Sequence, residues 1–227
     1  MFYGNGNQAF HSPLQRALDV AGHEMSHGVV QGTANLEYQG QSGALNESFA
    51  DIFGAMIDRD DWQMGEDITS TNYISTGALR SLSDPNNGGS SLSTPGWQPK
   101  TMSEFQNLAN TPQQDFGGVH INSGIPNFAY FIFASDIGKD KAELIYYRAL
   151  DVYLVKSSQF VDLRNAVVQS ASDLYGTAEV NAANSAFDQV GIGQGAGDDY
   201  QDDVVLNDGD ERVLHADAGL ELSLIHI

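Results

Sequence analysis

The sequence contains no cysteine, so neither disulfide bonds nor thiolate metal ligands are available to it. This absence does not decide the compartment in which the protein works. The sequence also lacks an apolar run of about eighteen residues, which excludes a transmembrane helix. Its first residues, Met-Phe-Tyr-Gly-Asn-Gly, contain no basic segment followed by an apolar one, so we expect no signal peptide.

Basic residues are scarce. Ten Lys and Arg residues oppose 30 Asp and Glu residues, which gives a net charge of −20. Such a charge argues against binding to nucleic acid and to anionic membrane surfaces. Hydrophobic residues make up 41% of the 227 residues, which is enough for a sizeable core in one or two domains.

The stretch that organises the chain opens with His23-Glu24-Met-Ser-His27. If it is helical, His23 and His27 leave one face about one turn apart, and both imidazoles can bind a single Zn²⁺. Glu24 beside them can act as a general base on a water molecule at that ion. The alternative is a pair of hydrogen-bonded histidines on an amphipathic helix.

A second apolar-periodic segment carries Glu47, with nineteen residues between it and His27. A carboxylate there can supply a third zinc ligand and leave the fourth position open, as catalytic zinc requires. Asp51 follows one helical turn later and can accept the free N–H of a ligating histidine. The alternative for Glu47 is a solvated helix residue.

These motifs resemble the thermolysin family of zinc metallopeptidases, which has HExxH, a glutamate after nineteen residues and an Asp four further on. The likeness covers residues 1–193 and includes a second motif, Gly-Gly-Val-His-Ile-Asn-Ser-Gly at 117–124. The resemblance implies a mainly α fold, namely the zinc helix and the helical C-terminal lobe of the catalytic domain. It also predicts that Met1 is an internal methionine and that the N-terminal β lobe is largely missing.

The resemblance implies further catalytic residues. Tyr38 and His120 would donate hydrogen bonds to the oxyanion, and Asp115 would orient the His120 ring. Arg80 would bind the substrate carbonyl on the leaving-group side. Taken alone, these residues are a packed aromatic, an ordinary loop histidine and surface charges. Phe116 departs from the family, which often has a polar residue there.

Five carboxylates lie between Asp58 and Asp67. They form either a solvated loop or a Ca²⁺ site, because Ca²⁺ takes six to eight oxygen ligands. The pattern is not that of an EF-hand. The resemblance implies a structural calcium ion, most simply one, held by Asp19, Asp58, Asp61 and Glu66.

The function implied is that of a zinc endopeptidase which cleaves protein or peptide substrates before bulky apolar residues. Family positions predict that Phe10, Leu14, Val20 and Leu79 line the pocket for that residue. We expect a monomer, and the resemblance implies secretion. Two alternatives remain: a metal-binding fragment without catalytic competence, and a non-catalytic, zinc-stabilised interaction module.

The periodicity predicts helices over 13–31, from Ser42 or Gly43 to Arg59, and over 101–108, 125–137, 139–155, 160–175 and 178–190. Residues 68–118 otherwise have the composition of a long irregular segment. Residues 194–221 are predicted to be an acidic linker, a tail or the start of an accessory domain. The last six residues, 222–227, resemble a non-native scar.

Overall fold

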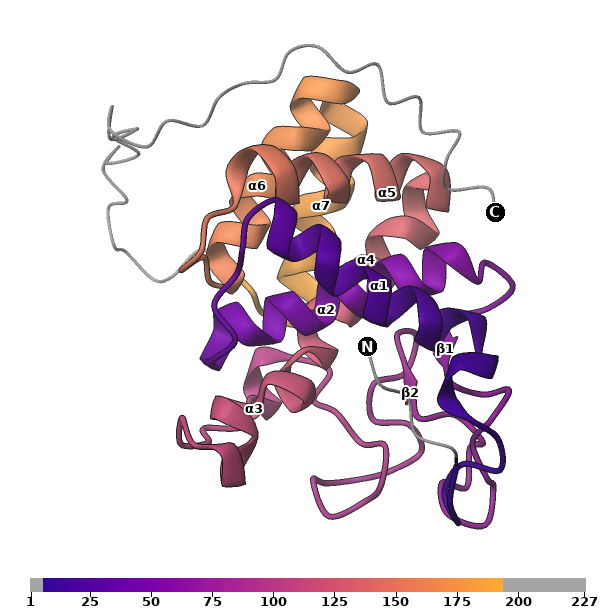
Figure 1. Cartoon of the computed structure of the whole chain (residues 1–227). Coiled ribbons are helices and arrows are strands. Elements are labelled where there is room, and N and C mark those ends of the chain that lie inside the picture. The colour runs from indigo at the N-terminus through magenta and orange to yellow at the C-terminus, as the bar shows by residue number, and fades with distance from the viewer. Residues whose placement is uncertain (1–5, 194–227) are drawn as a thin grey trace. The chain divides into compact units, whose positions relative to one another are not determined.

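The computed structural model describes residues 6–193 (Figure 1). Its helices begin with a 3₁₀ turn, Leu14–Arg16, followed by α1, Leu18–Gly32, and α2, Gly40–Ile57. Then come α3, Asp115–Asn122; α4, Gly124–Ile137; α5, Lys139–Arg148; a π-helical turn, Ala149–Tyr153; α6, Phe160–Leu174; and α7, Thr177–Val190. The prediction of a mainly α-helical region is confirmed. The predicted boundary at residue 193 stays a prediction, and the two predicted segments beyond it lie outside the described residues.

The zinc-motif helix begins later than its sequence predicts. Pro13 precedes a 3₁₀ turn instead of opening the α-helix, because Ala17 takes an extended backbone conformation (φ −85°, ψ 124°) between the turn and α1. The predicted helix over 139–155 is likewise interrupted, since the π-helical turn widens its last part. The helix predicted over 101–108 is reduced to a 3₁₀ turn, Met102–Glu104.

The segment between α2 and α3 is irregular, as its composition predicts. It contains two short antiparallel strands, β1, Gln63–Met64, and β2, Arg80–Ser81, with Met64 opposite Arg80. A further 3₁₀ turn, Pro112–Gln114, leads into α3. The strand pair holds Arg80 near α2, and Met64 packs into the main core. Within residues 6–193, no helix combines the length and apolar character needed to cross a membrane.

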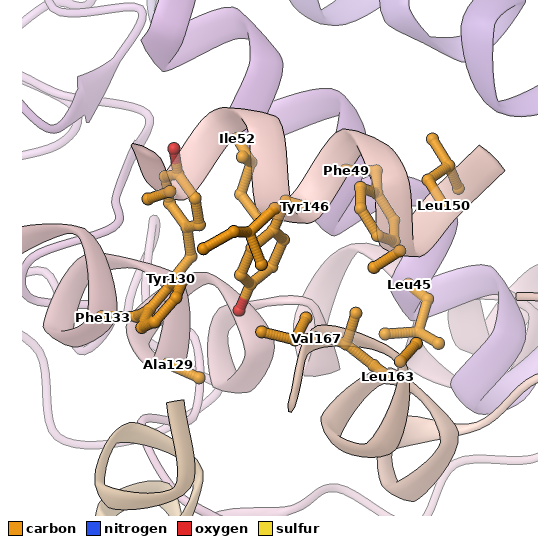
Figure 2. Close-up of a cluster of buried hydrophobic side chains, with 14 of the residues drawn as sticks. Leu45, Phe49, Ile52, Ala129, Tyr130, Phe133, Tyr146, Leu150, Leu163 and Val167 are labelled. Carbon is orange, nitrogen blue, oxygen red and sulfur yellow. The ribbon is translucent and has the colours of Figure 1, made fainter. Parts of the chain in front are cut away.

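The main core lies where α2 meets the C-terminal helices. Figure 2 shows side chains from α2, α4, α5 and α6 gathered around Tyr146, whose ring lies 4.6 Å from that of Tyr130 in an edge-to-face contact. Burying aromatic rings of this size contributes much of a core's free energy. Because α2 belongs to this core, the functional residues on its other face are held by a rigid element.

Candidate metal centre

The ligand atoms of the three predicted zinc residues converge. The Nε2 atoms of His23 and His27 lie 3.1 Å apart on α1. Glu47 on α2 places Oε2 at 3.4 Å from the His23 Nε2 and Oε1 at 3.6 Å from the His27 Nε2. A tetrahedral zinc ion with ligands at ~2.05 Å has a ligand–ligand edge of about 3.3 Å. The donor set and its spacing therefore fit zinc.

Two glycines allow α1 and α2 to approach closely beside these ligands. A Cβ atom on Gly54 would lie 2.6 Å from the Asp19 carbonyl oxygen and 3.2 Å from the His23 nitrogen. A Cβ atom on Gly22 would lie 2.8 Å from Cδ1 of Ile57. A side chain at Gly54 would clash with the backbone of α1, and one at Gly22 would crowd Ile57, so both glycines favour the close approach that brings the Glu47 carboxylate within reach of both histidines.

Each histidine is oriented through its other ring nitrogen. Nδ1 of His23 lies 2.7 Å from Oδ1 of Asp51, and Nδ1 of His27 lies 2.8 Å from Oδ1 of Asn46. Asn46 also donates from Nδ2 to the Leu36 carbonyl, which fixes its amide orientation. Because both partners are acceptors, each Nδ1 carries the proton and each Nε2 is left free for a metal ion. Sequence reasoning assigned no role to Asn46, although its place beside Glu47 was a signal.

Asp51 is the centre of a buried polar network. Its Oδ1 also accepts a hydrogen bond from Nη2 of Arg80 at 2.8 Å, and its Oδ2 accepts one from Nδ2 of Asn127 at 2.9 Å. Ser48 donates in turn to Asn127 at 2.7 Å. Arg80 and Asn127 come from distant segments, so the network ties the metal ligands to β2 and α4.

These contacts shift the pKa values of the metal ligands in the metal-free protein. Burial disfavours the charged form of His23, but the hydrogen bond and charge of Asp51 outweigh it and raise the pKa of His23 to about 9. Burial also disfavours the Glu47 carboxylate, but its contacts with His23 and the charge of His120 lower the pKa of Glu47 to about 2. Asp51 and Glu47 thus give the site a negative charge, which a second proton on His23 balances in the metal-free protein and which a metal ion would balance in its place.

Tyr38 and His120 reach the same carboxylate from two other segments. The Tyr38 hydroxyl donates to Oε1 of Glu47, and its oxygen lies 3.1 Å from Nε2 of His120. That Nε2 atom lies 3.4 Å from the same Glu47 oxygen. Tyr38 and His120 thus meet at one oxygen of the third proposed zinc ligand.

His120 is held by Asp115 through two contacts. Its Nδ1 lies 2.6 Å from Oδ1 of Asp115, and its backbone N–H donates to Oδ2 at 2.8 Å. Four consecutive residues before it, Asp115 to Gly118, adopt left-handed backbone conformations, with φ of 54°, 49°, 89° and 79°. The glycine pair predicted a turn here. The sequence did not predict that Asp115 and Phe116, which are not glycines, would also be left-handed.

A cavity of about 490 Å³ connects these groups. Glu24, the predicted general base, lies on its wall with the zinc ligands, Tyr38 and His120. The remaining lining residues are three carboxamides, Gln31, Asn35 and Asn46. The predicted base, metal ligands and oxyanion donors therefore share one open space.

The four predicted pocket residues lie elsewhere. Val20 packs with Ala17 and Ile68 in a small hydrophobic cluster, against which Phe10 and Leu14 are partly buried. Leu79 is partly buried and lies near Gly65. None of the four predicted pocket residues is among the residues that line the 490 Å³ cavity.

Three of the four predicted calcium ligands form a second cluster. Carboxylate oxygens of Asp19, Asp58 and Glu66 all lie within 4.8 Å of one another. Asp61 is not in this group, and its Oδ1 accepts the backbone N–H of Gln63 at 2.7 Å. Oδ1 of Asp19 and Oε2 of Glu66 are buried without a hydrogen-bond partner. A cation would satisfy both oxygens, so the donor set fits Ca²⁺.

The pKa values of this cluster agree with the need for a cation. Burial raises the pKa of Asp19. Burial and the nearby charges of Asp19, Asp61 and Asp58 raise the pKa of Glu66 to about 7. Without a cation, these carboxylates take up protons more readily than exposed ones.

Comparison with known protein families agrees with the geometry of the site. Residues 34–192 match the family described as thermolysin metallopeptidase, alpha-helical domain, and residues 1–31 match its catalytic domain. The chain belongs to the thermolysin family of metallopeptidases. The resemblance predicted from the zinc motif is confirmed, and membership of the family implies a zinc ion.

Individual relatives of this thermolysin-family chain are bacterial proteases. The chain is 50% identical over 192 residues to bacillolysin of Bacillus amyloliquefaciens, a match that covers 85% of this chain and 34% of the relative. It is 49% identical to neutral protease NprE of Bacillus pumilus, covering 85% and 60%. This chain therefore spans between a third and two thirds of the length of these relatives.

A solved structure supports the same assignment. The precursor of protealysin, a metalloproteinase from Serratia proteamaculans, superposes with a TM-score of 0.74 at 31% sequence identity. The match covers 84% of this chain and 62% of that one. The fold of this chain is thus shared with that metalloproteinase precursor.

Proposed function

We propose that this chain carries the zinc-binding and catalytic side chains of an endopeptidase. The observation that supports this most is the meeting of Glu24, Tyr38 and His120 with the zinc ligands around one cavity. Holding zinc needs only His23, His27 and Glu47, so a base and two hydrogen-bonding groups beside the open position favour catalysis over a structural role.

Bound zinc supplies a Lewis acid that lowers the pKa of water and polarises the scissile carbonyl group. The Glu24 carboxylate takes the proton of the attacking water and delivers it to the departing amine. Tyr38 and His120 donate hydrogen bonds to the carbonyl oxygen as negative charge develops on it. One such donor is typically worth about 3 kcal/mol in the transition state.

The contact with Asp115 decides which protonation state of His120 can donate. Since Nδ1–H is directed to the Asp115 carboxylate, Nε2 donates only when the ring carries both protons. Asp115 thus acts as a positioning residue for His120.

Arg80 is proposed to bind the substrate carbonyl on the leaving-group side. One of its terminal nitrogens is engaged with Asp51, and its Nε is buried without a partner. Its side chain is 14% exposed, and it is not among the residues that line the 490 Å³ cavity, so a substrate would reach only the exposed part of the guanidinium. The ion pair with Asp51 keeps the guanidinium in this position.

We further propose cleavage before bulky apolar residues, with Phe10, Leu14, Val20 and Leu79 providing the apolar surface on the leaving-group side. The small cluster that Val20 forms with Ala17 and Ile68 supports a pocket of this character. A library of internally quenched peptides should show preference for Leu or Phe after the scissile bond, whereas preference for a charged residue there would contradict the proposal.

A calcium ion is proposed at Asp19, Asp58 and Glu66. The two buried carboxylate oxygens without partners support it. Asp19 lies one turn before His23 on α1, so an ion there would stabilise the same helix that carries the zinc motif. Asp61 is proposed as a fourth ligand, through the carboxylate oxygen that does not accept the Gln63 N–H.

The proposed substrates are proteins or peptides, and the chain is proposed to act as a monomer outside the cell. The extracellular setting rests on relatives such as the extracellular elastase of Staphylococcus epidermidis, which is 46% identical over 192 residues. The net charge of −20 supports the exclusion of nucleic acid and anionic membranes as partners.

Metal content and casein hydrolysis, measured on one preparation of each variant, test the function. We expect about one zinc per chain in wild type and in Glu24→Gln, with hydrolysis lowered at least ~10²-fold in the variant because the base is lost. Glu104→Gln, outside the site, is the control and should keep full activity. Zinc in wild type without hydrolysis would indicate a fragment that needs further sequence to act, and folded protein without zinc would refute the proposal.

A further inference from the structure

The acidic loop, residues 58–67, is fastened to the start of α5 by a lysine. Lys139 is the first residue of α5, and its Nζ donates to the carbonyl oxygen of Arg59 at 2.7 Å and to that of Asp61 at 3.0 Å. The same ammonium group lies 4.1 Å from the ring centroid of Trp62. Three contacts from one cation to three loop residues are more than a solvated surface lysine makes.

The Arg59 side chain does not bind the acidic loop in this way. The Arg59 guanidinium is directed at α5, where it pairs with Glu143 at 2.6 Å and with Asp140. Lys139 lies in the electrostatic field of Asp58, Asp60 and Asp61, and each of these charges raises its pKa. Burial is the larger effect and, with the charge of Arg59, lowers the pKa of Lys139. The ammonium group is thus partly desolvated and set in a field of carboxylates.

The partners of Lys139 are those that calcium also uses. Main-chain carbonyl oxygens and aspartate carboxylates are hard oxygen ligands, and Ca²⁺ binds several of each. Asp58 belongs both to the group that acts on Lys139 and to the proposed calcium cluster. An ammonium ion and a calcium ion in one loop share the same negative charge and repel each other.

We propose that Lys139 is a resident cation of the acidic loop, which occupies two of its carbonyl oxygens and part of its negative charge in competition with calcium. The loop then holds its shape with a single divalent ion, because the ammonium group supplies the remaining positive charge. This inference rests on the proposed calcium site. It predicts negative coupling between the two cations, and such coupling must be reciprocal.

Calcium titration of Lys139→Met and Lys139→Arg by calorimetry measures the coupling. Methionine keeps an unbranched apolar side chain against Trp62 but removes the charge, so we expect calcium to bind at least about ten-fold tighter or a second calcium ion to bind. Arginine keeps the charge and should resemble wild type. Lys141→Met is the matched control, since Lys141 pairs with Glu179 at 2.6 Å and should leave calcium binding unchanged.

The outcomes separate this inference from the calcium proposal. Calcium binding to wild type with equal or weaker binding to Lys139→Met would overturn the resident cation and leave the calcium site standing. Binding to Lys139→Met alone would support the cation and refute the site in wild type, and binding to neither would overturn both.

A measurement on wild type alone covers the case in which Lys139→Met fails to fold. Reciprocity requires bound calcium to weaken the contacts of the Lys139 ammonium group with the loop, which leaves that group more accessible. The acetylation rate of Lys139 relative to Lys141 should therefore rise when calcium is added. An unchanged ratio would overturn the inference.

Discussion

The Nδ1 atom of His23 lies 2.7 Å from Oδ1 of Asp51, and this contact decides which nitrogen of the ring faces the metal site. The carboxylate only accepts hydrogen bonds, so it holds the proton on Nδ1 and directs the lone pair of Nε2 toward zinc. The same oxygen binds Arg80, which links the orientation of a metal ligand to a residue of the irregular segment.

Asp51→Asn tests this relationship. The amide keeps the shape but removes the charge that favours the oriented ring and pairs with Arg80, so we expect zinc affinity to fall by about 10–100-fold. Competition with a chromophoric chelator measures the affinity. Asp84→Asn, which alters a partly exposed ion pair with Lys100, is the control and should bind zinc as wild type does. Equal affinity in both variants would refute the orienting role of Asp51.

The raised pKa of His23 predicts how the metal-free protein responds to pH. Its ordinary value is 6.5 and its value in the folded protein is about 9, so the folded state binds more protons than the unfolded state between these values. The stabilisation is therefore fully present below pH 6.5 and is lost as pH rises toward 9. Thermal unfolding of EDTA-treated protein from pH 6 to 9.5 should show a falling Tm, and His23→Gln should flatten this part of the curve. A parallel decline in the variant would assign it to other groups.

Tyr38→Phe tests the proposed oxyanion donor. Removing the hydroxyl deletes one hydrogen bond that strengthens as charge develops, so we expect kcat to fall by about 10²–10³-fold with zinc content unchanged. Tyr73→Phe is the control because Tyr73 is 56% exposed and lies outside the cavity. Loss of zinc from Tyr38→Phe would instead assign the hydroxyl to positioning Glu47, to which it donates.

The sequence was most informative where function depends on spacing along a helix. His23, His27, Glu47 and Asp51 are placed by the periodicity of two helices, so their convergence follows once α1 packs on α2. Contacts between distant segments left no such pattern. Nothing local predicts that Arg80 meets Asp51, 29 positions away, since β2 must first pair with β1 to bring it there.

The sequence predicted the exact ends of helices and turns less well than it predicted their presence. Pro13 favours a helix start, but the extended backbone at Ala17 delays α1 to Leu18. A pair of glycines signalled the turn before His120, yet the left-handed conformation extends back to Phe116 and Asp115 because the contacts of Asp115 with His120 hold it there. Propensity is a weak prior wherever tertiary contacts of this kind compete with it.

Gly118 provides a last test, of whether this turn is needed in its left-handed form. Its φ is 79°, and an added Cβ would lie 2.8 Å from Nδ2 of Asn122 and 3.2 Å from Cδ1 of Leu108. We expect Gly118→Ala to lower the free energy of unfolding by about 1–3 kcal/mol, because both the backbone conformation and the contact are unfavourable for alanine.

Gly28→Ala is the matched substitution for Gly118→Ala. Gly28 lies inside α1, and no heavy atom would lie within 4 Å of its Cβ, so alanine should raise the free energy of unfolding by up to about 1 kcal/mol. Urea denaturation of the two variants beside wild type measures both changes. If the left-handed turn constrains residue 118, the two changes in the free energy of unfolding must have opposite signs. Stabilisation by both alanines would mean that the turn before His120 tolerates an ordinary residue. Its conformation would then not be what holds the histidine in place.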